Sequence, residues 1–149
     1  MKQATLERNR TEPRLDRIAV TDAMHAGVLT CPTHTPLTAV ARMMAAHRIH
    51  AVVVFDEASD DVGGAELWGV VSDLDLVKAA NAGEITDRTA GGTAVTPIVL
   101  VDEQDTLAHA VQLMSEHEVA HLVVVSPQTG RPVGIISTLD VARALVKAA

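Results

Sequence analysis

This chain of 149 residues contains the same pattern twice, and the repeat limits the architectures open to it. Leucine, methionine, histidine and valine positions recur at an offset of 70 (107 − 37 = 70): Leu37, Met44, His47, Val53 and Val54 correspond to Leu107, Met114, His117, Val123 and Val124. Further along the offset falls to 65 (134 − 69 = 65): Gly69, Ser72, Leu74 and Asp75 correspond to Gly134, Ser137, Leu139 and Asp140. A loop in the polar stretch 56–66 accounts for the change in offset.

Each copy predicts the element order β-α-β-β-α. A short apolar strand is expected at 28–31 and again at 97–101, and a helix follows with apolar residues at i, i+3, i+4 and i+7. Capping residues at Thr35-Pro36 and Asp105-Thr106 begin these helices, with Pro36 at the first helical position. Two β-branched runs then predict strands at 51–55 and 67–71, mirrored at 121–125 and 132–136. Their continuous apolarity favours burial on both faces. The last helices are expected near 73–81 and 138–147.

We therefore expect an α/β fold of two β-α-β-β-α repeats, at 18–82 and 83–149, packed with pseudo-two-fold symmetry and leaving clefts between them. One repeat of roughly 60 residues would be marginally stable alone, which favours the pairing. Residues 1–17 form a polar N-terminal extension that contains Pro13 and is expected to be loosely ordered or to dock on a partner.

Composition excludes several classes of function. A net charge of −7, with Phe55 and Trp68 as the only aromatic residues, argues against nucleic-acid binding. No apolar stretch reaches the roughly 20 residues that span a bilayer, and the charged N-terminus does not read as a signal peptide. A single cysteine, Cys31, forms no internal disulfide and fits a cytoplasmic protein.

Two serine–aspartate pairs, Ser72 with Asp75 and Ser137 with Asp140, stand where the last strand of each copy meets its last helix. One interpretation is a capping box, in which serine caps the helix and the aspartate reaches back to the cap amide. The other is a ligand site. The free amides of the helix N-terminus and the serine hydroxyl would bind a phosphate, and the aspartate would accept two ribose hydroxyls. A glycine upstream would let a ligand or a neighbouring backbone come close.

The arrangement resembles the CBS-domain family, in which two repeats form a Bateman module. The resemblance covers about Ile18 to the C-terminus and rests on Asp22-Ala23-Met24, on the stretch 121–125 and on Gly-x-x-Ser-x-x-Asp in both copies. It implies that the module binds AMP, ADP or ATP, and less often S-adenosylmethionine or NAD, in the clefts between the repeats. It also implies that serine meets phosphate and aspartate meets ribose, and that no cofactor is required.

The resemblance implies further pocket residues besides Ser72, Asp75, Ser137 and Asp140. These are Ile49, His50 and Ala51 in the first copy and Val119, Ala120 and His121 in the second, with Thr30 and Leu100 near the base and Arg131 as a weaker phosphate contact. We expect the second copy to dominate binding. Because these positions hold no cluster of Arg or Lys, a monophosphate, a diphosphate or an uncharged adenosyl ligand is as plausible as a triphosphate.

Other functions remain as alternatives. His47 with His50, and His117 with His121, have helical spacing for a metal site but no acidic or cysteine partner beside them, so no metal is expected. No nucleophile elbow, phosphate-binding loop or dinucleotide fingerprint is present, so we expect no enzyme. The main competitor is a structural docking module with empty sites. We expect a homodimer that acts in trans on an effector protein, since the repeats leave no room for a fused one.

Overall fold

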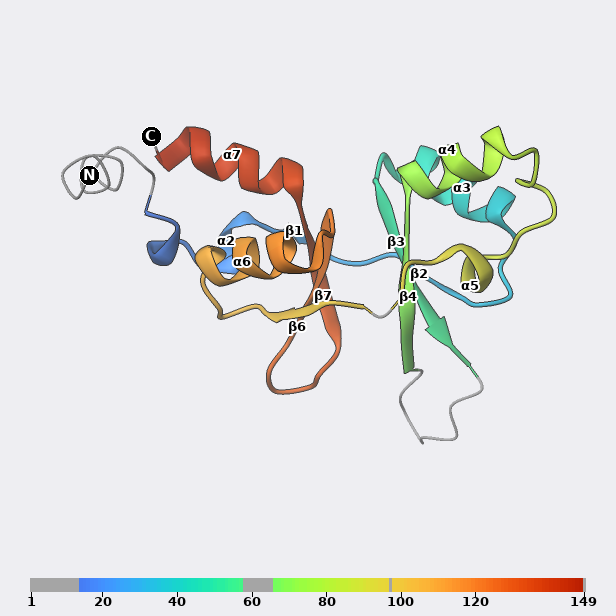
Figure 1. The fold of residues 1–149 in the computed structure, drawn as a ribbon. Coiled ribbons are helices and arrows are strands. Elements are labelled where there is room, and N and C mark those ends of the chain that lie inside the picture. Colours follow the sequence, from blue (N-terminus) through green and yellow to red (C-terminus); the bar gives the residue numbers. More distant parts are fainter. Residues whose placement is uncertain (1–13, 58–65, 97, 149) are drawn as a thin grey trace. The chain divides into compact units, whose positions relative to one another are not determined.

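The computed structural model describes residues 14–57, 66–96 and 98–148, and these form two compact units (Figure 1). Unit 2 runs from Val28 to Ile98. Unit 1 contains the chain up to Gly27 and again from Val99 onward. Each unit has its own sheet and its own core.

Unit 2 is built on a three-stranded sheet in the order β2-β3-β4. Its elements are β2 (Thr30–Pro32), α3 (Leu37–His47), β3 (Ala51–Asp56), β4 (Glu66–Ser72), α4 (Asp73–Asn81) and α5 (Ala90–Thr93). β2 pairs with β3 in parallel and β3 with β4 antiparallel. The central strand β3 is buried along Ala51–Val54, as its continuous apolar sequence predicts.

Unit 1 repeats this plan on a four-stranded sheet in the order β1-β7-β6-β5. Its elements are η1 (Leu15–Arg17, a 3₁₀ turn), α2 (Val20–Ala23), β1 (His25–Ala26), β5 (Leu100–Asp102), α6 (Leu107–His117), β6 (His121–Val125), β7 (Pro132–Ser137) and α7 (Thr138–Ala148). β5 and β6 are parallel, and β6 and β7 are antiparallel. The α/β class and the repeated element order are thus confirmed.

Element boundaries differ from the prediction at the first strand and helix of each copy. β2 and β5 begin at Thr30 and Leu100, later than expected, and Pro97 lies outside the described residues. α3 begins at Leu37 with Pro36 as its N-cap, so Pro36 is not the first helical residue. The backbone of Pro36 is extended, with ψ at 144°, and it follows a turn in which the Thr35 amide donates to the Pro32 carbonyl at 3.1 Å. In α6 the cap is Thr106, whose hydroxyl accepts from the amide of His109 at 3.1 Å.

The compact units do not follow the repeats. The segment at 19–26 belongs to the first repeat in sequence but pairs with the second: His25 lies opposite Ile135, and Ala19 opposite Thr106. The equivalent segment of the second repeat, 89–95, pairs within unit 2, where Val95 lies opposite Val70. Each unit therefore combines the opening segment of one repeat with the strands and helices of the other.

Two glycines make this close pairing possible. A Cβ on Gly134 would lie 2.5 Å from the His25 carbonyl oxygen and 2.7 Å from the Met24 sulfur. A Cβ on Gly69 would lie 2.6 Å from the Val95 carbonyl oxygen. The glycine of each Gly-x-x-Ser-x-x-Asp motif thus admits a neighbouring backbone, one of the two roles that the sequence left open.

Apolar side chains from both parts of unit 1 share one core. Val20 from the opening segment is fully buried with Leu107, Leu122 and Ile136. Residues 1–13 of the expected N-terminal extension lie outside the described residues, whereas Leu15 packs against this core. Within the described part of the chain, no helix is long and apolar enough to span a bilayer.

Candidate functional site

Both serine–aspartate pairs form capping boxes. In unit 1 the Asp140 Oδ2 accepts from the Ser137 amide at 2.8 Å and from its hydroxyl at 2.9 Å. In unit 2 the Asp75 Oδ2 accepts from the Ser72 amide at 2.8 Å and from its hydroxyl at 3.0 Å. The carboxylates are therefore held rigidly at the N-termini of α7 and α4. Each uses one oxygen for the cap and keeps the other for a further partner.

The two carboxylates differ in their second partner. The Asp140 side chain is only 2% exposed, and its Oδ1 lies 2.8 Å from Nδ1 of His25. The imidazole of His25 is 62% exposed, so it can turn away into solvent. Asp75 is half-buried, and the position in unit 2 that corresponds to His25 is Val95 (25 + 70 = 95). Unit 1 thus holds a buried carboxylate covered by one exposed side chain.

The structure brings the segments at 49–51 and 119–121 to the capping boxes. His121 lies opposite Ser137 in the β6–β7 ladder, and Ala51 lies opposite Ser72 in the β3–β4 ladder. The amide of Thr138 donates to the Ala120 carbonyl at 3.1 Å, and the amide of Asp73 to the His50 carbonyl at 2.9 Å. Ile49 and Val119 follow directly after the left-handed residues that end α3 and α6.

The structure places three further predicted residues, Thr30, Leu100 and Arg131, outside the segments that form the capping boxes. Thr30 lies opposite Val53 on β3, and Leu100 lies opposite Val123 on β6, so each is two strands away from the strand that carries its capping box. Arg131 precedes β7, whereas Ser137 ends it. With a rise of about 3.3 Å per residue, Arg131 and Ser137 are roughly 20 Å apart along the chain. The structure therefore does not bring Arg131 to Ser137 and Asp140.

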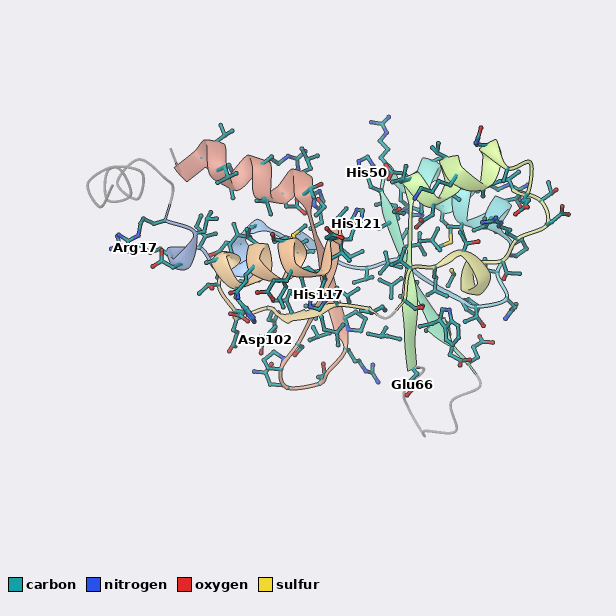
Figure 2. The ribbon with its side chains drawn as sticks, in the orientation of Figure 1. Arg17, His50, Glu66, Asp102, His117 and His121 are labelled. Atoms are coloured by element: carbon teal, nitrogen blue, oxygen red, sulfur yellow. The ribbon has the colours of Figure 1, made fainter. Side chains whose placement is uncertain are left out.

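The two histidines among the expected pocket residues, His50 and His121, have their own neighbours. His50 is labelled in Figure 2. Its Nδ1 lies 3.0 Å from Oδ2 of Asp73, the first residue of α4, and both side chains are exposed. His121 opens β6 and is half-buried. His47 and His117 are the last residues of α3 and α6. Among the described residues, no three His, Cys, Asp or Glu side chains form a metal-binding group.

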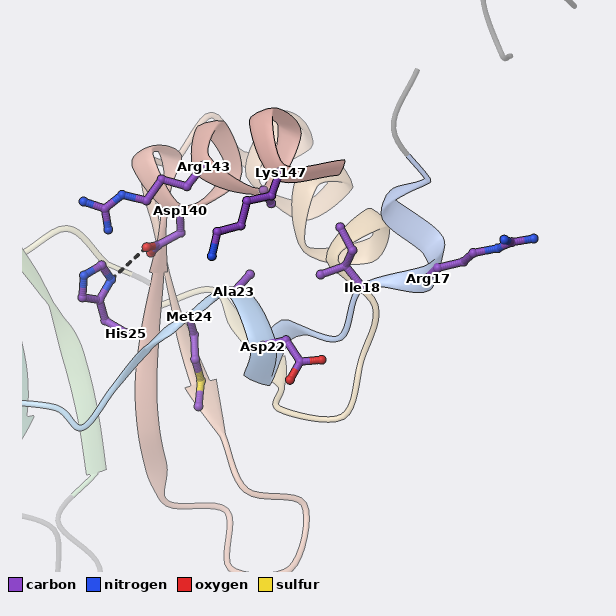
Figure 3. A pocket seen from close by; sticks show the side chains of 10 residues that line it. Arg17, Ile18, Asp22, Ala23, Met24, His25, Asp140, Arg143 and Lys147 are labelled. Atoms are coloured by element: carbon purple, nitrogen blue, oxygen red, sulfur yellow. Dashed lines mark ion pairs between the residues drawn. The ribbon is translucent and has the colours of Figure 1, made fainter. Parts of the chain in front are cut away.

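A pocket of about 550 Å³ opens in unit 1 beside Asp140 (Figure 3). That volume lies in the range of small-molecule sites, about 300–1,000 Å³. One wall is the segment from Arg17 to His25, and the other is α7 through Asp140, Arg143 and Lys147. Sequence reasoning missed His25, Arg143 and Lys147. The helical spacing of Arg143 and Lys147 from Asp140 could have indicated these two residues, because residues at that spacing share one helix face. His25 could not be found in this way, because its approach to Asp140 depends on the pairing of β1 with β7.

Cys31 takes no part in this site. It lies on β2 in unit 2 and is 4% exposed. Burial raises the pKa of its thiol, against a smaller opposing effect of a hydrogen bond with Thr35. A thiol with a raised pKa is a poor nucleophile, so a catalytic cysteine is not supported.

Comparison with known proteins places these features in one family. The family model described as "CBS domain" matches residues 20–82 and 92–147. Hypoxic response protein 1 of Mycobacterium tuberculosis is 36% identical over 126 residues, which is 83% of this chain and 82% of that protein.

Solved structures agree with this fold. The crystal structure of Hypoxic Response Protein I with two coordinated zinc ions is 33% identical, with a TM-score of 0.63 over 85% of this chain and 98% of that one. The CBS domain pair of protein MJ0100, solved with 5′-methylthioadenosine and S-adenosylmethionine, has a TM-score of 0.73 and 20% identity. That match covers 88% of this chain and 98% of that one.

Proposed function

The chain belongs to the CBS-domain family, and on that premise we propose that it senses an adenosine-containing nucleotide at Ser137–Asp140 and at Ser72–Asp75. CBS domain pairs are ligand-binding regulatory modules. The ligands of MJ0100 both carry an adenosyl group. AMP, ADP and ATP share the ribose and base of that group, and so do S-adenosylmethionine and NAD.

The observation that carries the proposal is the buried carboxylate of Asp140. One oxygen is fixed by Ser137, and the other meets only the exposed imidazole of His25 among the hydrogen bonds and ion pairs described for it. A ribose can replace that imidazole with a hydroxyl donor, so the carboxylate stays satisfied in the empty and the bound state. A buried acceptor in a preformed position contributes strongly to binding, because hydrogen bonds to charged groups are worth about 1.5–3 kcal/mol.

A thermal-shift screen of the full chain tests this proposal. A ligand at a hundredfold excess over its Kd stabilises the folded state by about 2.7 kcal/mol. At roughly 2–4 °C per kcal/mol, at least one of AMP, ADP, ATP, NAD and S-adenosylmethionine should raise Tm by about 5–10 °C. Asp140→Asn and Asp75→Asn should each remove the response of their own site. Nucleotide released by acid precipitation of the purified protein gives a second readout.

A structural docking module with empty sites is the competing function. α7 exposes Leu139, Leu145 and Val146, and α4 exposes Leu74 and Val77. Exposed apolar side chains on helices are typical of protein interfaces, so we propose that the chain forms a homodimer through helix faces. Sedimentation at tens of micromolar should give a dimer of the 15.7 kDa chain. A dimer whose Tm is unmoved by every adenosyl ligand would favour the docking function.

The proposed output of binding is a change in a separate effector protein. The effector would read the ligand state of the module rather than a product.

A further inference from the structure

A single polar contact bridges the two walls of the unit 1 pocket. Nδ1 of His25, on the opening segment, lies 2.8 Å from Oδ1 of Asp140 on α7, as the dashed line in Figure 3 shows. In the described parts of the chain, no other ion pair or side-chain hydrogen bond joins these two walls. The imidazole therefore occupies the carboxylate oxygen that Ser137 leaves available for a ligand.

The strength of this contact depends on the charge of the imidazole. A neutral imidazole with its proton on Nδ1 donates one hydrogen bond to the carboxylate. An imidazolium donates the same bond and adds the attraction of opposite charges, so its bond is stronger. Histidine is the side chain whose charge changes between about pH 5 and 8. We therefore expect the contact of His25 with Asp140 to strengthen as the pH falls through this range.

Asp140 is the partner that makes His25 sensitive to pH. The other charged side chains that line the pocket, from α7 and from the opening segment, are Arg143, Lys147, Arg17 and Asp22. Among the described residues, only Asp140 forms an ion pair with His25. The strand that pairs with β1 is β7, and its residues Pro132–Ser137 carry no titratable side chain.

The corresponding carboxylate of unit 2 has no such competitor. At the offset of 70, His25 corresponds to Val95, whose side chain cannot donate a hydrogen bond. Within the described residues, the hydrogen bonds of the Asp75 side chain are all made with Ser72. A ligand at Asp75 therefore displaces no side chain of this kind, whereas a ligand at Asp140 displaces His25.

We propose that His25 is an autoinhibitory side chain of the unit 1 pocket. It holds Asp140 in the empty state, leaves when a ligand hydroxyl binds there, and competes more strongly as the pH falls. The proposal rests on the proposed function for the ligand and adds a proton-dependent regulation that unit 2 lacks. Because the imidazole is 62% exposed, the competition should raise the Kd of the ligand by at most about fivefold.

Calorimetric titration of the full chain with adenosine tests the proposal, in the Asp75→Asn background so that only unit 1 responds. Adenosine is the probe because it has no group that titrates between about pH 5.5 and 8. His25→Ala should tighten binding about three- to fivefold at about pH 5.5 and at most about twofold at about pH 8. His25→Gln keeps a neutral donor, so its Kd should be the same at both pH values.

His109→Ala is the matched control. It also removes an exposed histidine of unit 1 whose Nδ1 contacts a carboxylate, that of Asp105, but His109 does not line the pocket. This change should leave the Kd of adenosine unaltered at both pH values. A merely structural role of His25 would lower the Tm of His25→Ala without tightening the binding of adenosine.

The outcomes separate this proposal from the proposed function. Weaker or unchanged adenosine binding by His25→Ala at about pH 5.5 would overturn the autoinhibition, while the binding itself upholds the proposed function. A pH response retained in His25→Gln would overturn the proton dependence, and this variant decides the matter if His25→Ala is poorly folded. Failure of both the background chain and His25→Ala to bind adenosine would overturn both proposals.

Discussion

Asp140→Ala should destabilise the unliganded protein more than the same change at Asp75. The Asp140 carboxylate accepts from the amide and the hydroxyl of Ser137 and from His25, and it is 2% exposed. Loss of a helix cap costs about 0.5–2 kcal/mol, and the Ser137 amide left without a partner adds about 1–3 kcal/mol. The exposed link to His25 adds at most about 1 kcal/mol.

These effects amount to about 3 kcal/mol, which lowers Tm by roughly 6–12 °C in a chain of this size. Asp75→Ala removes the same two contacts with Ser72 from a half-buried carboxylate without a histidine partner, so we expect about half that loss. Circular dichroism during heating and in urea measures both. A Tm of Asp140→Ala within 1 °C of the parent chain, or a smaller decrease than that of Asp75→Ala, would refute the reasoning.

Three other changes test the fold. Gly134→Ala should lower the free energy of unfolding by about 1–3 kcal/mol, because its Cβ would lie 2.5 Å from the His25 carbonyl oxygen. Gly92→Ala is the control and should leave stability unchanged, because the nearest atom to its Cβ would be 3.4 Å away. Equal effects of the two changes on Tm would contradict the close pairing. The His109 hydrogen bond lowers the pKa of Asp105 below 3.8, so this carboxylate stabilises the fold above that pH and loses the effect as pH falls through its folded pKa. Asp105→Asn should thus cost about 0.5 kcal/mol at pH 7 and less at pH 3, and a Tm difference independent of pH would contradict this. Cys31, buried and with a raised pKa, should react with a disulfide reagent at least about tenfold more slowly in the folded chain than in urea, and equal rates would refute its burial.

The sequence was sufficient to predict elements whose stability comes from local patterns. The apolar spacing at 37–44 and 107–114 and the β-branched runs gave the helices and strands, and Ser72 and Ser137 gave the capping boxes. The start of α3 differed from the prediction by one residue, because Pro36 is the extended N-cap of this helix although proline is most common at the first helical position.

The exchange of the opening segments could not be predicted, because no local pattern links His25 to Ile135 across more than 100 residues. The sequence feature that reflects this exchange is the pair Gly69 and Gly134. From sequence alone, these glycines are explained equally well as positions where a ligand comes close. The same long-range pairing brings His25 to Asp140, so sequence reasoning missed this partner. Sequence reasoning also proposed Arg131, because closeness to Ser137 in sequence does not reveal that β7 runs from just after Arg131 to Ser137 and keeps the two apart.

The most direct test of the account is an equilibrium titration of AMP into the full chain and into the Asp75→Asn, Asp140→Asn double variant. The account predicts saturable binding to the parent chain and its loss in the double variant, with both proteins folded by circular dichroism. Unchanged AMP binding in the folded double variant would contradict the central claim that the capped carboxylates hold the ribose.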